Sequence, residues 1–159
     1  MNLIYQRADI NNINDLVDLR IKQILFFVNR DGLVIENEKI LRENIKKILL
    51  QELNKTIFFF IAIDKNTDKV IASNCSIVQQ VLPSNLFVTG KRAYITSVYT
   101  DDNYRRNGIQ DVLMKMNLDF LKELNCFNIE LDASNPPAIK LYEKFGFKKI
   151  DIKYVLTNL

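Results

Sequence analysis

The segment from Ile95 to Phe147 constrains the fold more than any other part of this sequence. It reads as the end of a strand, a polar loop with one glycine, Gly108, a helix with a regular apolar stripe, a strand from Phe127 to Asp132, and a second helix. A strand, a helix and a further strand in one sheet form a parallel pair with a right-handed crossover. The segment therefore predicts an α/β layer rather than an all-α or all-β fold.

The preceding residues supply further elements of the same fold. Apolar residues recur at helical spacing after Asn11 and Asn12, either of which could cap a helix, and again between Glu36 and Leu53. The pattern predicts an α/β fold with a mixed central sheet flanked by helices, in a single domain over residues 1–159. The other expected strands are Leu3–Tyr5, Thr56–Asp64, Lys69–Gln80, Arg92–Tyr99 and a final strand Phe147–Leu156.

Composition excludes several classes of site. The 159 residues include no histidine, which removes Ser-His-Asp and Cys-His nucleophiles and histidine-based zinc sites. Cys75 and Cys126 lie too far apart for a thiolate zinc motif, so we expect two reduced structural thiols, with one disulfide as the alternative, and no metal. The longest apolar run, Ile57–Ile63, is far shorter than the roughly 20 residues of a membrane span, and no signal-peptide pattern is present. We expect a cytoplasmic protein without a membrane partner.

The charge of the chain is mild. A net charge of +3 is too small to indicate nucleic-acid binding by itself, and it is also compatible with a small polyanionic ligand.

The loop before the first helix of the Ile95–Phe147 segment is a candidate phosphate site. Arg105, Arg106 and Gly108 stand directly before the helix, whose first N–H groups have no partner within the helix and carry the positive end of its dipole. The loop has neither a Walker A nor a GxGxxG pattern. A solvated loop with a capping glycine is the alternative.

A second candidate site lies between Leu131 and Phe147. Asn135 precedes a helix that opens with two prolines, which the first turn of a helix tolerates. Tyr142 lies on the apolar face of this helix and is the residue of that face with a titratable proton. It could donate that proton to a leaving thiolate, or it could be core packing with its hydroxyl at the surface.

Taken together, in this order and at this separation, the two segments resemble the GNAT superfamily of acetyl-CoA-dependent N-acetyltransferases. The resemblance covers about Ile95 to Ile150, and the order of elements fits over nearly the whole chain. It is carried by Val98, Tyr99, Thr100, Tyr104, Arg105, Arg106, Gly108, Ile109, Asn135, Ala138, Leu141, Tyr142, Gly146 and Phe147.

The resemblance implies a GNAT fold, acetyl-CoA as co-substrate, and a role for each matching residue. The coenzyme A pyrophosphate would lie on the loop made by Arg105, Arg106, Asn107, Gly108, Ile109 and Gln110. The strand end Val98-Tyr99-Thr100 would pair with the pantetheine arm, which Asn135 would also contact. The Val98 N–H would polarise the thioester carbonyl, and Tyr142 would protonate the departing thiolate.

Two features depart from the family pattern. Gln110 stands where the family usually has glycine or alanine, and its side chain could donate to the pyrophosphate or crowd it. The strand 92–97 offers no carboxylate as general base, although many members carry a glutamate there. Asp101, Asp132 or Glu36 could replace it through water, or solvent could take the proton.

The sequence thus predicts an N-acetyltransferase that acts on a primary amine of a small molecule or peptide by direct attack. The alternative from another class is a non-catalytic module that binds an acyl-CoA. A nucleic-acid-binding domain rests only on Lys148, Lys149, Lys153 and the mild charge, so we expect no such partner. The acceptor and the oligomeric state are not specified, and a homodimer stays open.

Overall fold

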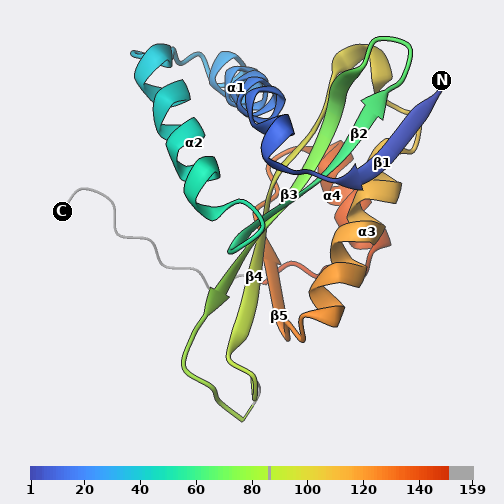
Figure 1. The fold of residues 1–159 in the computed structure, drawn as a ribbon. Coiled ribbons are helices and arrows are strands. Elements are labelled where there is room, and N and C mark those ends of the chain that lie inside the picture. Colours follow the sequence, from blue (N-terminus) through green and yellow to red (C-terminus); the bar gives the residue numbers. More distant parts are fainter. Residues whose placement is uncertain (86, 151–159) are drawn as a thin grey trace.

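A five-stranded mixed sheet forms the centre of the molecule. The computed structural model describes residues 1–85 and 87–150, and the strands lie in the order β1-β2-β3-β4-β5 (Figure 1). The first four pair antiparallel, whereas β4 and β5 are parallel, as the crossover in the sequence predicts. The bounds are β1 Leu3–Arg7, β2 Ile57–Asp64, β3 Lys69–Gln80, β4 Lys91–Thr100 and β5 Asn128–Leu131.

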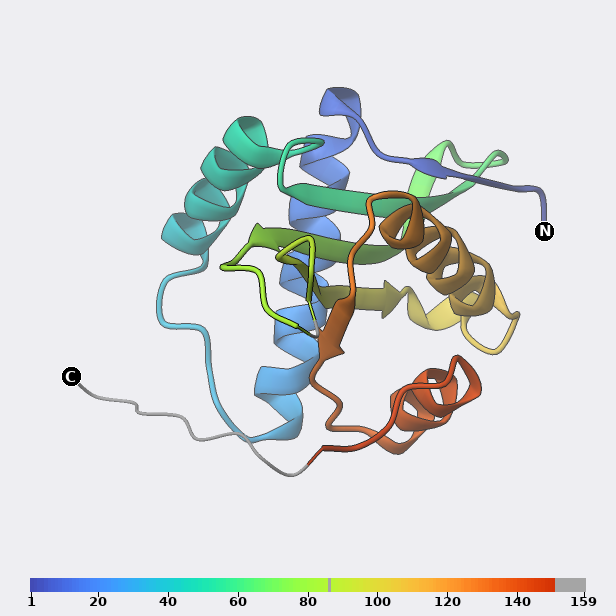
Figure 2. The same ribbon diagram turned by 90° about the horizontal axis from the view of Figure 1, so that it is seen from below.

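Helices cover both faces of this sheet, which confirms the predicted α/β layers. Helices α1 (Ile13–Arg30) and α2 (Glu38–Glu52) lie on one face, and α3 (Ile109–Glu123) and α4 (Pro136–Lys144) lie on the other (Figures 1 and 2). Strand β2 serves both layers because successive side chains of a strand point to opposite faces. Phe59 and Ile61 pack with α1, whereas Phe58, Phe60 and Ala62 pack with α3.

Polar caps and glycines set the helix boundaries. Asn37 and Asn135 act as N-caps, accepting hydrogen bonds from the backbone N–H of Ile40 at 3.1 Å and Ala138 at 2.8 Å. Asn12 takes the N-cap position of α1 without a side-chain hydrogen bond. Its side chain instead accepts from the Asp9 N–H, within a capping box around the 3₁₀ turn η1 (Ile10–Asn12).

The final strand of the prediction is wrong over the residues that can be compared. Residues 147–150 form neither helix nor strand, and the remainder of the predicted strand lies outside the described residues. Locally, the Phe147 N–H donates to the Tyr142 carbonyl at 3.1 Å, beside Gly146 at φ +87°. Phe147 therefore completes the C-terminal cap of α4, with its ring against Tyr142, instead of starting a strand.

The sheet opens in the second half of β4. Pairing with β5 stops at Ile95 and Leu131, although β4 continues to Thr100. Pairing with β3 is also interrupted there, because Ser73 faces Tyr99 whereas Cys75 faces Thr96. Ser97, inside this bulge, has φ +49°, a left-handed conformation that residues with side chains rarely adopt. A bulge is thus present in β4, where the end of the strand separates from its parallel neighbour.

Candidate functional site

A cavity of about 520 Å³ lies at this opening. Its wall combines α1, the end of β4, the loop before α3, the first turn of α3 and the start of α4, so segments far apart in the sequence meet there. The lining residues are Gln23, Phe26, Phe27, Val98, Tyr99, Thr100, Tyr104, Arg105, Arg106, Gly108, Ile109, Gln110, Asp111, Asn135, Pro137, Ala138 and Leu141.

Nearly all of the predicted site residues line this cavity. The exceptions are Asn107 and Tyr142. Helix α1 contributes Gln23, Phe26 and Phe27, none of which was singled out from the sequence, although the family resemblance places the acceptor side of the site along residues 9–53. The signal available in the sequence was a polar residue, Gln23, among the apolar residues that recur along this helix. Its burial is visible only in the structure.

The loop before α3 presents a row of backbone N–H groups. Arg106 and Gly108 adopt left-handed conformations, with φ +63° and +70°. Within the described part of the chain, no hydrogen bond engages the backbone N–H groups of residues 106–110. Asn107 stabilises the loop from outside the cavity, because its side-chain amide donates to the carbonyls of Tyr104 and Arg105, both at 3.0 Å. Such a row at a helix N-terminus is suited to an anion.

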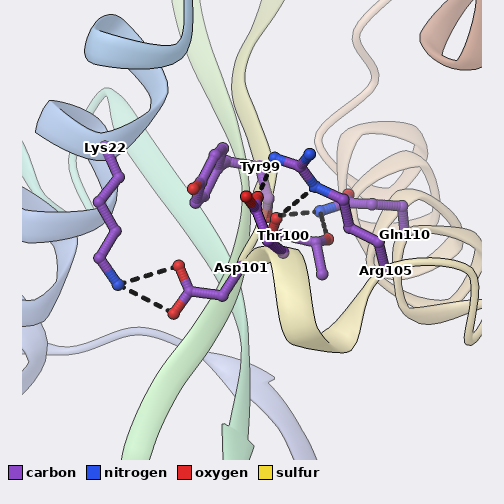
Figure 3. Close-up of polar contacts among 7 residues, drawn as sticks. Lys22, Tyr99, Thr100, Asp101, Arg105 and Gln110 are labelled. Carbon is purple, nitrogen blue, oxygen red and sulfur yellow. Dashed lines mark hydrogen bonds and ion pairs between the residues drawn. The ribbon is translucent and has the colours of Figure 1, made fainter.

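Arg105 is held in place by several groups. Its Nε donates to the Thr100 carbonyl at 3.1 Å (Figure 3). Its Nη2 lies 2.6 Å from the Asp102 carboxylate. The guanidinium also lies over the rings of Tyr99 and Phe26, 5.7 Å and 5.2 Å from their centroids. Arg105 therefore joins the loop to β4 and to α1, and Arg106, also exposed, is the second cation on the cavity wall.

Side chains hold four consecutive carbonyl groups at the end of β4. Because this stretch lies beyond the pairing with β5 and contains the bulge, its carbonyls need partners other than a regular ladder. The donors come from β3, α1, α3 and the loop, so the opened strand is fixed from every side. The pairs are Ser73 Oγ to Ser97 O at 2.9 Å, Gln23 Nε2 to Val98 O at 3.2 Å, Gln110 Nε2 to Tyr99 O at 2.8 Å, and Arg105 Nε to Thr100 O at 3.1 Å.

Tyr142 lies behind the cavity wall. Its side chain is 7% exposed and packs in the same apolar cluster as Val98 and Leu141. Burial raises the pKa of its hydroxyl to about 12, so the group stays protonated at neutral pH. A protonated hydroxyl on a residue that packs with Val98 of the opened strand is chemically able to donate a proton.

The carboxylates considered as general bases either accept hydrogen bonds from other side chains or do not line the cavity. Asp101 accepts two hydrogen bonds from Lys22, and Asp132 accepts one from the Tyr94 hydroxyl at 2.6 Å. Glu36 is exposed between α1 and α2 and does not line the cavity. The carboxylate that does line it, Asp111, pairs with Lys144.

Both cysteines are free thiols, in agreement with the sequence prediction. Cys75 is 1% exposed, and burial raises the pKa of its thiol, as it does for the half-buried Cys126. Neither lines the cavity. Among residues 1–85 and 87–150, no cluster of three acidic or thiol side chains could hold a metal ion. In the same residues, no helix combines the length and apolarity that a membrane span requires.

Comparison with known proteins gives a consistent result. The family model described as acetyltransferase (GNAT) family matches residues 24–147. An N-alpha-acetyltransferase of Sulfurisphaera tokodaii is 34% identical over 67 residues, which are 39% of this chain and 39% of that protein. N-alpha-acetyltransferase 30 of Homo sapiens is 39% identical over 59 residues, 36% of this chain. The chain thus spans well under half the length of these curated relatives, and only 16% of the human one.

A solved structure matches over almost the full length. It is described as a predicted acetyltransferase with acetyl-CoA from Clostridium acetobutylicum. The TM-score is 0.84 and the identity 26%, over 98% of this chain and 96% of that one. The expectation of this fold, drawn from two short motifs, is therefore confirmed.

Proposed function

Because this chain belongs to the GNAT family of acetyltransferases, we propose that it transfers the acetyl group of acetyl-CoA to a primary amine. The acceptor is an amine of a small molecule or peptide, and the amine attacks the thioester directly, without an acyl-enzyme. Residues 1–159 act as one domain, located in the cytoplasm and needing no metal. The observation that carries the proposal is the cavity at the opening of β4, which residues of the loop and of the strand end line together.

The loop before α3 fits the pyrophosphate of coenzyme A. The free N–H groups of residues 106–110, the N-terminal end of the α3 dipole and the cations of Arg105 and Arg106 all favour an anion. Gly108 supports this fit, since it adopts φ +70° and leaves the backbone accessible.

The opened end of β4 fits the pantetheine arm. Val98, Tyr99 and Thr100 line the cavity beyond the last pair with β5, and Asn135 lines it from the start of α4. In this proposal the Val98 N–H donates to the thioester oxygen, where negative charge develops during attack, and Asn135 contacts the arm. The co-substrate supplies the activated acetyl group, and the protein supplies position and hydrogen-bond donors.

Tyr142 is proposed as the general acid. Its hydroxyl, with a pKa of about 12, is protonated at any physiological pH. Donation from this buried hydroxyl to a thiolate, whose conjugate thiol has a pKa of roughly 8.5, is uphill by more than three pKa units. We therefore expect a contribution near the lower end of the range of about 10²–10⁴-fold that general acids supply.

The acceptor amine loses its proton to water in this proposal. An alkylammonium with a pKa of roughly 10 must deprotonate before it attacks. Asp101 and Asp132 already accept hydrogen bonds from protein donors, and Glu36 is not at the cavity. A chain of water molecules to the bulk solvent is the route consistent with these positions.

The proposal is tested by acetyl-CoA turnover with a panel of primary amines and free peptides. Released coenzyme A thiol is measured with and without each amine, and binding of acetyl-CoA is measured by calorimetry. Amine-dependent thiol release is the expected result. Tight binding of acetyl-CoA without amine-dependent thiol release would favour the alternative, a non-catalytic acyl-CoA-binding module. The absence of a carboxylate base from strand 92–97 supports that alternative. Absence of acetyl-CoA binding would refute both.

A further inference from the structure

We infer that Gln110 is a positioning residue that joins the two halves of the acetyl-CoA site into one rigid unit. Its side chain holds the first turn of α3, where the pyrophosphate is proposed to bind, against the end of β4, where the thioester is proposed to bind. The inference rests on the proposed function for the identity of the ligand, and on the hydrogen bonds of this chain for the rigid link.

The Gln110 side chain points toward the two strands (Figure 3). Its Nε2 carries two N–H groups and lies within hydrogen-bonding distance of three acceptors, so one hydrogen is shared. The acceptors are the Tyr99 carbonyl at 2.8 Å, the Thr100 hydroxyl at 3.0 Å and the Ser73 carbonyl at 3.1 Å. Its Oε1 accepts from Asn74 Nδ2 at 3.4 Å. The donating capacity of this amide is thus used by β3 and β4. The sequence suggests that Gln110 either donates to the pyrophosphate or crowds it. Both roles require a side chain that points toward the ligand, whereas this one points toward the strands.

A buried polar chain continues from Gln110 under α3. Asn117 Nδ2 donates to Asn74 Oδ1 at 2.6 Å, and Ser76 donates to Asn117 Oδ1. Asn74, Asn117 and Ser76 are each 0% exposed, and no buried side-chain nitrogen or oxygen in the described part of the chain lacks a partner. A fully satisfied hydrogen-bond network among buried side chains favours one arrangement of the elements that it connects. It therefore sets the position of α3 relative to β3, and Gln110 extends that constraint to β4.

A glycine or alanine at position 110, as is usual in the family, could not make this link. A fixed separation between two subsites matters for a ligand such as acetyl-CoA, which occupies both. Binding of one end of the ligand raises the effective concentration of the other end at its own subsite. Loosening the separation lowers the affinity for the whole ligand while each half still binds its own subsite. A direct contact between Gln110 and the pyrophosphate would instead affect the nucleotide half and the whole ligand equally.

The test compares acetyl-CoA with its two halves. Dissociation constants are measured for acetyl-CoA, for 3′-phosphoadenosine 5′-diphosphate and for S-acetylpantetheine, on the parent chain, Gln110→Ala and Gln110→Met. The second variant keeps the length of the side chain but removes its donors. We expect acetyl-CoA affinity to fall about tenfold in both variants, the scale of one lost net hydrogen bond, with each half changing less than about twofold.

Two outcomes would overturn the inference. One is a parallel loss for the nucleotide half and the whole ligand, which would identify a direct pyrophosphate contact. The other is unchanged acetyl-CoA affinity in both variants. Val17→Ala, in the core under α1, serves as the control for destabilisation alone: it should lower the melting temperature without changing the ratio between whole and halves. Gln51→Ala, on the exposed face of α2, is the matched surface control.

A measurement without ligand separates this inference from the proposed function. Amide hydrogen exchange at residues 98–101 should be about tenfold faster in Gln110→Ala than in the parent, because the end of β4 loses one of its fixed partners. If the parent fails to bind acetyl-CoA, the proposed function is wrong, yet faster exchange would still support the rigid link. Unchanged exchange would refute the link whatever the ligand.

Discussion

An ion pair between Lys22 of helix α1 and Asp101, the residue that follows β4, connects the helix to the end of that strand. Lys22 Nζ donates to both carboxylate oxygens, each at 2.9 Å (Figure 3). The two side chains are 49% and 23% exposed, so solvent screens their attraction and the pair stabilises the fold by only about 0–1 kcal/mol. The pair nevertheless occupies the carboxylate nearest in sequence to the end of β4, which bears on the choice of general base.

We predict that Asp101→Asn changes turnover less than about threefold. Loss of a true general base would cost about 10²–10⁴-fold, whereas loss of an exposed ion pair should cost less than about 1 kcal/mol of unfolding free energy. The measurement is kcat with one accepted amine, together with urea unfolding. Lys22→Gln breaks the same pair and is the matched control. A hundredfold loss of kcat in Asp101→Asn, absent from Lys22→Gln, would assign the base to Asp101.

Gly108→Val should weaken acetyl-CoA binding at least tenfold. Gly108 has φ +70°, and an added Cβ would meet only Asp111 Oδ2, at 3.8 Å. No protein atom therefore blocks a valine side chain at this position. The loss of affinity comes from backbone strain and from a side chain placed in the proposed path of the pyrophosphate.

Gly32→Val is the matched control for that experiment. Gly32 has nearly the same conformation, φ +69°, with nothing within 4 Å of an added Cβ, and it lies between α1 and α2. Both variants should lose about 1–2 kcal/mol of stability from the left-handed backbone, but only Gly108→Val should lose affinity, measured by calorimetry. Normal affinity in a folded Gly108→Val chain would remove the loop from the site.

For Tyr142→Phe we expect kcat to fall about a hundredfold with little change in acetyl-CoA affinity. The substitution keeps the ring, which packs against Phe147 with 6.1 Å between centroids, and removes only the hydroxyl. The high pKa of the Tyr142 hydroxyl sets the expectation at the lower end of general acid catalysis. Tyr5→Phe, on β1, controls for loss of a tyrosine hydroxyl elsewhere. A kcat within about twofold of the parent would make Tyr142 a packing residue, and the thiolate would take its proton from water.

The buried thiol of Cys75 should make the stability of the fold depend on pH above about 8.5. Burial raises the pKa of this thiol in the folded chain, so only the unfolded chain releases the proton near the ordinary value of roughly 8.5. The unfolded state then binds fewer protons than the native state, and unfolding free energy decreases as pH rises, by up to about 1.4 kcal/mol per unit.

Cys75→Ala isolates this contribution. Between pH 7 and pH 10 the parent should lose about 2 kcal/mol more unfolding free energy than the variant, as measured by urea unfolding in the presence of reductant. The difference removes the effects of Cys126 and of the tyrosines, which are common to both proteins. Equal losses would mean that the Cys75 thiol ionises within the folded chain.

The local elements were predictable because short-range rules determine them. Strand β3 has the predicted bounds, and Asn135 with two following prolines marks the start of α4 as expected. The failed final strand shows the limit of such rules. The segment after Gly146 has an apolar pattern that suits a strand, yet Phe147 packs on Tyr142 and closes the helix, a contact that the pattern does not contain.

The sequence by itself determined the order of the elements, the α/β class, and the loop and strand end that form most of the cavity. These features depend on residues close to one another in the chain, where periodicity, caps and glycine conformations act. Only the tertiary structure decided that α1 closes the cavity through Gln23, that Lys22 occupies Asp101, and that the Gln110 amide faces the strands. Each of these contacts joins residues on different elements, and those of Gln23 and Gln110 depend on where the bulge in β4 places its carbonyls. Register and bulge position follow from packing of the whole sheet, which no local pattern encodes.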